Sequence, residues 1–188
     1  YDNILHSSLA NSCSSCHEQE YAFTTPSSNA LAHINLGYNP AFLWNGAVQG
    51  TMEDIMKFEV EDFFGTKPER LNAHAEYPAL FKKVFGVTEI TNKEIEYALA
   101  QFMRTMISSD SKFDKYLRRE ASLTPQELSG LGIYFSEKGD CFHCHATTLQ
   151  TDNLFHNTGL DVNPDSGRYA VTKNPLDRGA FKSPTLKN

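Results

Sequence analysis

The sequence predicts a mainly α-helical fold that ends in a loop-rich C-terminal part. Apolar residues recur at helical spacing along residues 91–109, and a second helix-start pattern follows near residue 124. In contrast, no segment alternates polar and apolar residues for long enough to demand a sheet. After residue 145 the chain becomes dense in Asn, Asp, Gly and Pro, which favour turns and loops.

Three further segments carry helical patterns. Residues 51–58 and 67–86 precede the helical segment 91–109, and residues 111–120 follow it. Gly86 is placed to end the second segment, because glycine readily adopts the left-handed conformation that often follows a helix.

The longest predicted helix, in residues 91–109, begins with a capping box of Thr91 and Glu94. The apolar positions expected to face the core are Ile95, Leu99, Phe102, Met103 and Met106. Methionines at helical spacing are far more often core residues than metal ligands, and this also holds for Met52 and Met56.

The next helix is expected to begin at Thr124, with Pro125 at its first position and Glu127 completing a capping box. We expect Gly139 to end it just before a pair of cysteines. Linker character is greatest near residues 118–125, which predicts two domains, 1–120 and 121–188.

Composition narrows the class of protein. A chain of 188 residues with 40% apolar and 12% aromatic side chains can bury one sizeable core or two small ones. The net charge of -6 disfavours nucleic acid as a partner and suits an electropositive protein. No apolar run approaches the roughly 20 residues of a membrane span, and no signal segment opens the chain. Both ends suggest a fragment of a longer protein.

The four cysteines form two copies of one motif, Cys-x-x-Cys-His, at Cys13–His17 and Cys141–His145. Two thiols at this spacing can form thioethers to the haem vinyl groups, and the histidine that follows can coordinate the iron. Cys13, Cys16, Cys141 and Cys144 are thus predicted to attach two c-type haems, with His17 and His145 as iron ligands. Such attachment implies export to the periplasm.

Two alternatives compete with haem. A zinc site can be built from two cysteine pairs, but zinc ribbons hold their pairs much closer in sequence, and zinc does not explain a histidine after both pairs. A thioredoxin-like redox pair expects a preceding strand and a βαβ setting, whereas this chain has helical patterns.

The order of motifs resembles that of the bacterial di-haem cytochrome c peroxidases and their MauG-type relatives. The resemblance covers nearly the whole chain and implies two cytochrome c-like helical domains with one haem each, the second incomplete here. It rests on the segments CSSCHEQEYAFT, INLGYNPAFLWNG, AEYPALFKKVFG, ALAQFMRTMISSDSKFDKYL, LTPQELSGLGIYFSEKGDCFHCH, DSGRYAVT and GAFKSPTLKN.

The resemblance assigns unlike roles to the two motifs. It implies that the haem at His17 reduces hydrogen peroxide, and that the haem at His145 accepts electrons from a small cytochrome c or copper protein. Trp44 matches a tryptophan that lies between the haems in the family. A lone tryptophan beside Phe42 and Leu43 can equally be core filling.

Peroxide cleavage needs a group that takes a proton from one oxygen and returns it to the other, which suits a carboxylate. The family uses a glutamate on the far side of the first haem. Glu59 matches that position and Glu61 is its rival. The simpler alternative is that both are solvated acidic residues at a helix end.

Several further residues stay open. His33 is either a packing residue or a removable ligand of the first haem. Asn29 matches a residue that helps to hold calcium in relatives. The second ligand of the haem at His145 is expected from sequence beyond residue 188. His143 and His156 are expected to be hydrogen-bonded neighbours or surface residues.

Three functions remain from the sequence. The first is a peroxidase that reduces hydrogen peroxide with electrons from a donor protein. The second is a MauG-like oxidase that oxidises side chains of a partner protein. The third is an electron carrier whose two irons are permanently six-coordinate. The oligomeric state stays open, with a homodimer as one alternative.

Overall fold

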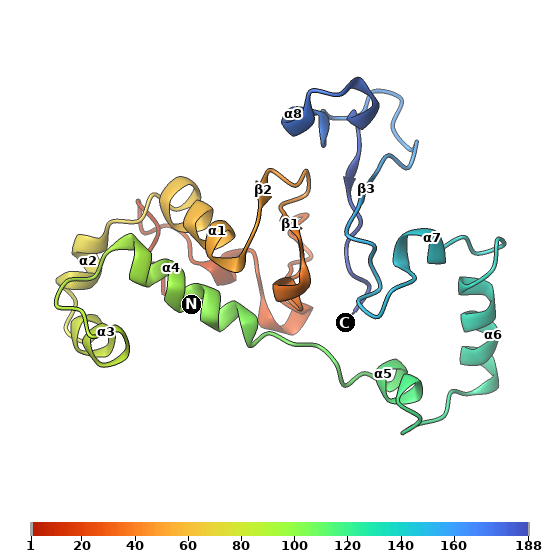
Figure 1. The fold of residues 1–188 in the computed structure, drawn as a ribbon, viewed down its shortest axis with the longest axis horizontal. Helices are drawn as coiled ribbons and strands as arrows, with labels where there is room; N and C mark the ends of the chain where they lie inside the picture. The colour runs from red at the N-terminus through yellow and green to blue at the C-terminus, as the bar shows by residue number, and fades with distance from the viewer. Residues whose placement is uncertain (1, 188) are drawn as a thin grey trace. The chain divides into compact units, whose positions relative to one another are not determined.

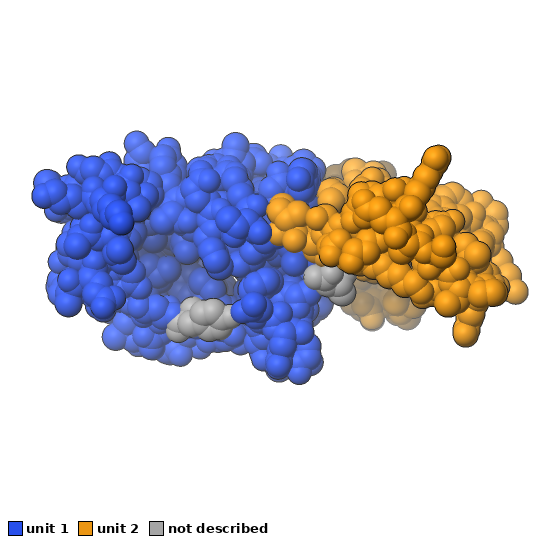
Figure 2. Space-filling model, turned by 90° about the horizontal axis from the view of Figure 1, so that it is seen from below, with its two compact units in different colours: residues 1–42, 48–106 blue, residues 43–47, 107–188 orange. Residues whose placement is uncertain are grey.

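The computed structural model describes residues 2–187. The chain divides into two compact units, coloured separately in Figure 2. Unit 1 consists of residues 1–42 and 48–106, and unit 2 of residues 43–47 and 107–188. All residues after Met106 therefore belong to unit 2. The boundary near residue 120 between two haem-binding domains stays a prediction.

Unit 1 is built mainly from short helices, with one two-stranded antiparallel ribbon in which Ala41 lies opposite Gln49 and Phe42 opposite Val48. Its elements in chain order are η1 (Cys13–Ser15), η2 (Gln19–Tyr21), η3 (Leu36–Tyr38), β1 (Ala41–Phe42), β2 (Val48–Gln49), α1 (Met52–Lys57), the π-helix η4 (Phe58–Phe63), α2 (Pro68–Asn72), α3 (Tyr77–Phe85) and α4 (Asn92–Arg104).

The core of unit 1 forms around α4, which packs against α1 (Figure 1). The predicted capping box is present: the Glu94 carboxylate accepts from the backbone nitrogen and the hydroxyl of Thr91. Arg104 donates to both carboxylate oxygens of Glu53, at 2.7 Å each, and so joins the two helices. The core cluster consists of Val60, Leu71, Ile90 and Ile95.

The prediction that Phe102 faces the core was wrong. Ile95 and Met103 are buried, but the side chain of Phe102 is 55% exposed. Their helix buries Glu96 and Ala100 instead, so its inward face is rotated toward these two positions. Helical spacing fixes only which residues share a face, and packing decides how far that face extends.

Unit 2 has shorter elements joined by loops. They are α5 (Lys112–Leu117), α6 (Pro125–Tyr134), α7 (Phe142–His145), β3 (Phe155–His156), α8 (Tyr169–Thr172), η5 (Pro175–Asp177) and β4 (Phe181–Lys182). Strands β3 and β4 pair antiparallel, with Phe155 opposite Lys182. The fold is therefore mainly helical, with only two-residue strands among the residues described.

Helix α6 starts as predicted but ends earlier. The Thr124 hydroxyl accepts from the backbone nitrogen of Glu127, and Pro125 occupies the first turn. The helix ends at Tyr134 rather than at Gly139, so the predicted end was wrong. Gly139 instead allows a close approach of two backbone segments. A Cβ at this position would collide with the Ile133 carbonyl, because the loop folds back onto the helix end.

Among residues 2–187, no helix has both the length and the apolar character to cross a membrane.

Candidate haem-binding sites

The first motif lies on a short turn of unit 1. Cys13 begins the helix η1, and the backbone nitrogen of His17 donates to the Cys13 carbonyl at 3.0 Å. This turn keeps Cys16 and His17 close to Cys13. Both Cys13 and Cys16 carry free thiols.

The second motif repeats this geometry in unit 2. The backbone nitrogen of His145 donates to the Cys141 carbonyl at 3.0 Å, within the turn that α7 forms. Cys141 and Cys144 are likewise free thiols. In addition, the Tyr134 hydroxyl of α6 donates to the His145 carbonyl at 2.7 Å, which fastens the motif to the helix that precedes it.

Both histidines are held by the same kind of hydrogen bond. The Nδ1 atom of His17 lies 2.7 Å from the Phe23 carbonyl, and that of His145 lies 2.8 Å from the Gln150 carbonyl. Because a carbonyl only accepts, Nδ1 must carry the proton in each ring. Nε2 is therefore left with its lone pair, as an iron ligand requires.

These residues fit two c-type haems. Each site offers two free thiols in the sequence spacing of a haem-attachment motif, together with an imidazole whose Nε2 can bind iron. The apolar side chains near the second motif also suit a flat apolar group, since Ile133 and Phe135 are 45% and 48% exposed.

The structure separates the two candidate glutamates of the π-helix η4. Glu59 is half-buried, and this burial raises the pKa of its carboxyl to about 7. Burial, followed by the charge of Glu59, raises the pKa of the Cys13 thiol, so the two groups are within electrostatic reach. Glu61 is exposed and lies 4.0 Å from Lys57. A π-helix is rare and is frequent at functional sites.

His33 lies directly against the first iron ligand. Its ring stacks on that of His17 with centroids 3.4 Å apart and planes at 19°. Burial, and then the neighbouring His17, lower the pKa of His33 to about 3, so the ring is neutral near pH 7. Face-to-face stacking puts His33 beside His17.

Trp44 is half-buried in the turn between β1 and β2, which belongs to unit 2. Its carbonyl accepts from the backbone nitrogen of Lys182 at 2.7 Å. Arg168 donates to the carbonyls of Asn45 at 2.9 Å and Gly46 at 2.8 Å. The turn is thus fixed by the segments DSGRYAVT and GAFKSPTLKN, while the bridging role of Trp44 stays a prediction.

The remaining candidates have ordinary surroundings. His156 Nε2 lies 2.7 Å from Asp152, and His143 Nε2 lies 3.2 Å from Asp140, so both have carboxylate neighbours. Asn29 is exposed, and its part in a calcium site stays a prediction. Met52, Met56 and Met103 are core residues, each 7% exposed or less, which agrees with the interpretation from spacing.

Sequence reasoning missed the groups that orient the two histidines. The Phe23 and Gln150 acceptors are backbone carbonyls, which leave no mark on residue identity. Each belongs to a residue with positive φ, 61° for Phe23 and 51° for Gln150. Non-glycine residues adopt this conformation only where surrounding contacts enforce it. Tyr134 was also missed, although its position before the motif could have pointed to it.

Fold and motifs together define a helical protein of the c-type cytochrome class. More narrowly, the chain belongs to the di-haem cytochrome c peroxidase family, whose model matches residues 1–122. Cytochrome c551 peroxidase of Nitrosomonas europaea is 30% identical over 212 residues, which cover 100% of this chain and 63% of that protein. MauG of Methylorubrum extorquens is 30% identical over 209 residues, covering 100% of this chain and 59% of MauG.

A solved structure agrees with these relatives. It is described as a MauG-like protein associated with microbial copper homeostasis, and it matches with a TM-score of 0.87 and 30% identity. The match covers 99% of this chain and 66% of that one. The chain thus spans 59% to 64% of the length of the first three curated relatives.

Proposed function

We propose that this chain carries the peroxide-reducing site and the electron-accepting site of a di-haem c-type peroxidase. The reaction joins hydrogen peroxide, two electrons and two protons to give two molecules of water. In this proposal each of two cytochrome c-like domains, residues 1–120 and 121–188, attaches one haem. Family membership supports it, and so does the shared geometry of the two motifs.

One observation carries the assignment of peroxide chemistry to the first site. The half-buried Glu59 carboxyl, with a pKa of about 7, lies within electrostatic reach of the first motif. A general acid or base works best when its pKa is near the operating pH. At the second motif the nearby Asp152 is instead paired with His156 at 2.7 Å.

The chain's own residues divide the work in the proposed mechanism. His17 and His145 present Nε2 to the iron atoms, and haem, once bound, supplies an open coordination position and stored electrons. Glu59 takes a proton from one peroxide oxygen and returns it to the other, which leaves as water. Iron coordination by His17 and His145 requires neutral imidazoles with a free lone pair on Nε2. The Nδ1 hydrogen bonds of both histidines favour this tautomer.

Electrons enter in the proposal at the haem of His145 from a small cytochrome c or copper protein. The net charge of -6 suits a donor with a basic surface, and such attraction acts chiefly on the association rate. Trp44 is proposed as the bridge for electrons between the haems, because it matches a tryptophan that lies between the haems in the family. Hydrogen bonds from Lys182 and Arg168 hold its turn in place. Covalent haem attachment favours the periplasm as the compartment in which the protein works.

A MauG-like oxidase is the second candidate. The MauG of Methylorubrum extorquens is as similar to this chain, at 30% identity, as the cytochrome c551 peroxidase. Such an enzyme would use the same haem pair to oxidise side chains of a partner protein. Peroxide turnover with a reduced small donor protein distinguishes the peroxidase, because a MauG-like oxidase would not consume that donor at a matching rate.

Separate replacement of the two histidines tests the proposed division of labour. The variants are His17→Met and His145→Met in the full chain, with mass measurement to verify that both haems are attached. We expect His17→Met to abolish peroxide reduction while donor oxidation by the other haem persists for one turnover. His145→Met should block donor oxidation. Indistinguishable losses in the two variants would refute the assignment.

A further inference from the structure

The loop that orients His145 is held in a strained conformation. Gln150, whose carbonyl accepts the Nδ1 proton of His145, has a φ of 51°. A left-handed conformation is unfavourable for a residue with a side chain. Locally, the backbone nitrogen of Gln150 donates to the Thr147 carbonyl at 2.8 Å. Contacts from elsewhere in the chain must help to maintain the conformation.

Those contacts come from residues 183–187, which we name the C-terminal strap. The Thr185 hydroxyl donates to the Leu149 carbonyl at 2.6 Å, and the backbone nitrogen of Leu186 lies 3.3 Å from the Gln150 carbonyl. The Gln150 carbonyl therefore accepts from two donors, the His145 ring and the strap.

The strap also forms hydrogen bonds with the chain before and after the loop that carries Gln150. The Thr151 hydroxyl donates to the Ser183 carbonyl at 2.6 Å. The Ser183 hydroxyl in turn donates to the carbonyl of Cys144 at 3.3 Å, inside the second motif. Every one of these bonds joins the strap to residues 144–151.

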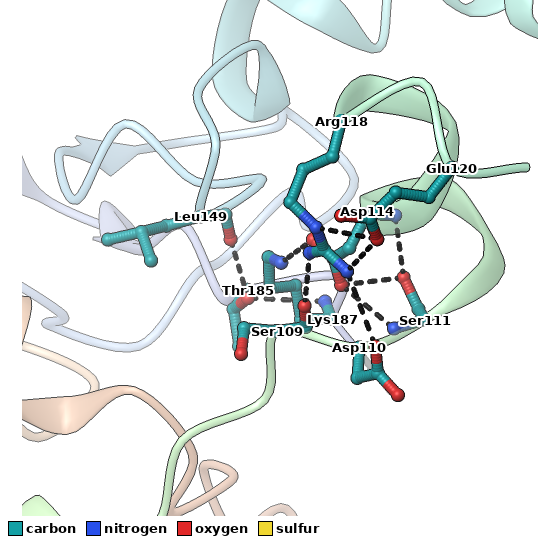
Figure 3. A network of polar contacts seen from close by, with 9 residues as sticks. All are labelled: Ser109, Asp110, Ser111, Asp114, Arg118, Glu120, Leu149, Thr185 and Lys187. Atoms are coloured by element: carbon teal, nitrogen blue, oxygen red, sulfur yellow. Dashed lines mark hydrogen bonds and ion pairs between the residues drawn. The ribbon is translucent and has the colours of Figure 1, made fainter.

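A buried ion pair anchors the end of the strap (Figure 3). The Lys187 ammonium donates to Asp114 of α5, and the two side chains are only 8% and 7% exposed. The other carboxylate oxygen of Asp114 accepts from the hydroxyl of Ser111 at 2.7 Å. Burial would raise the pKa of Asp114, but the hydrogen bonds from Lys187 and Ser111 outweigh it and lower that pKa. The carboxyl of Asp114 is therefore charged at neutral pH.

The first motif is held in a different way. Its acceptor residue, Phe23, is fixed by nearby sequence, since its backbone nitrogen donates to the Glu18 carbonyl at 2.9 Å. The Thr24 hydroxyl bonds the Ala30 carbonyl at 2.5 Å. The acceptor of His145 is instead held by the strap. The two histidines therefore make the same kind of Nδ1 hydrogen bond, but a different part of the chain holds each acceptor in place.

We propose that the C-terminal strap, anchored by Asp114 and Lys187, positions His145 and thereby sets the reduction potential of the second haem. Thr185 and Lys187 are positioning residues, which act through the Gln150 carbonyl. A firm Nδ1 hydrogen bond makes an imidazole a more basic ligand, which favours the oxidised iron and lowers the potential. The inference rests on the proposed function, because it concerns the electron-accepting haem.

The decisive variant is Thr185→Val, which keeps the shape of the side chain but removes its hydroxyl. We expect the midpoint potential of the haem at His145 to rise in a redox titration of the full chain. The haem at His17 should keep its potential. Resonance Raman should show a lower iron–histidine stretching frequency for the second haem only, because that frequency reports the strength of the Nδ1 hydrogen bond.

Two further variants make the test specific. Thr172→Val is the matched control, since the Thr172 hydroxyl bonds Asp177 at 2.5 Å on a different part of unit 2, and it should leave both potentials unchanged. Lys187→Met should raise the second potential as Thr185→Val does, and Lys187→Arg should restore it. If Lys187→Met does not fold, Thr185→Val alone decides.

Unchanged potentials and Raman frequencies in Thr185→Val, with or without a lower melting temperature, would overturn the inference and leave the strap a structural element. Failure of the proposed function looks different. A chain that shifts its second potential as expected but does not turn over peroxide supports the strap and refutes the peroxidase. Absence of covalent haem from the purified protein would refute both.

Discussion

The imidazole of His33 lies face to face with that of His17, at a centroid distance of 3.4 Å. This contact lets the ring of His33 steady the orientation of the His17 ring. This relationship favours the packing role for His33 among the two alternatives that the sequence leaves open.

We therefore predict that His33→Phe preserves the state of the first iron. Phenylalanine keeps a flat ring against His17 but cannot coordinate metal, so a packing residue should be replaceable. The electron paramagnetic resonance spectrum should show the same high-spin signal in wild type and variant, with peroxide turnover near the wild-type rate. Conversion from a low-spin to a high-spin first haem on substitution would instead identify His33 as a ligand.

Glu59→Gln should slow peroxide turnover by about 10²- to 10⁴-fold, the usual contribution of a general acid or base. The amide keeps the size of the side chain but cannot carry the proton. Because Glu59 must be ionised to accept that proton, wild-type kcat/KM should rise as pH passes through about 7, and this limb should vanish in the variant.

Glu61→Gln is the control for that measurement. It lies two positions further along the same π-helix but is exposed beside Lys57, so turnover should stay near the wild-type value. A large loss in Glu61→Gln with none in Glu59→Gln would exchange the two assignments.

The same carboxyl should make stability depend on pH. Burial raises the pKa of Glu59 from 4.5 to about 7, so the folded state favours the protonated form. Its stabilising effect is complete below pH 4.5 and is lost as pH rises through 7. Above pH 7, the free energy of unfolding of Glu59→Gln should thus exceed that of wild type by at most about 3 kcal/mol. The variant should therefore unfold at a higher denaturant concentration. Equal pH profiles of the two proteins would contradict this.

The core around α4 offers a test of its corrected face. Ile95 is 2% exposed, so Ile95→Ala should lower the free energy of unfolding by about 2 to 5 kcal/mol. Phe102 lies on the same helix at 55% exposure, and Phe102→Ala should cost less than about 1 kcal/mol. Chemical denaturation monitored by circular dichroism measures both; similar losses would mean that Phe102 is buried after all.

The local elements could be predicted because their causes lie within a few residues. The capping boxes at Thr91 and Thr124 pair side chains three positions apart, and Gly86 ends α3 with a φ of 73°. By contrast, the exposure of Phe102 and the early end of α6 at Tyr134 depend on what packs against each helix. Periodicity carries no information about those neighbours.

The sequence by itself predicted two haem-attachment sites, because each Cys-x-x-Cys-His motif places two thiols and an imidazole within five residues of the chain. It also singled out Glu59 and Glu61 as candidate carboxylates but could not tell which of them is the more buried. Only the tertiary structure made that distinction, and only it revealed the Gln150 carbonyl, the strap and the Asp114–Lys187 pair. Those contacts join residues far apart in the chain, and their strength comes from burial, which no single segment can specify.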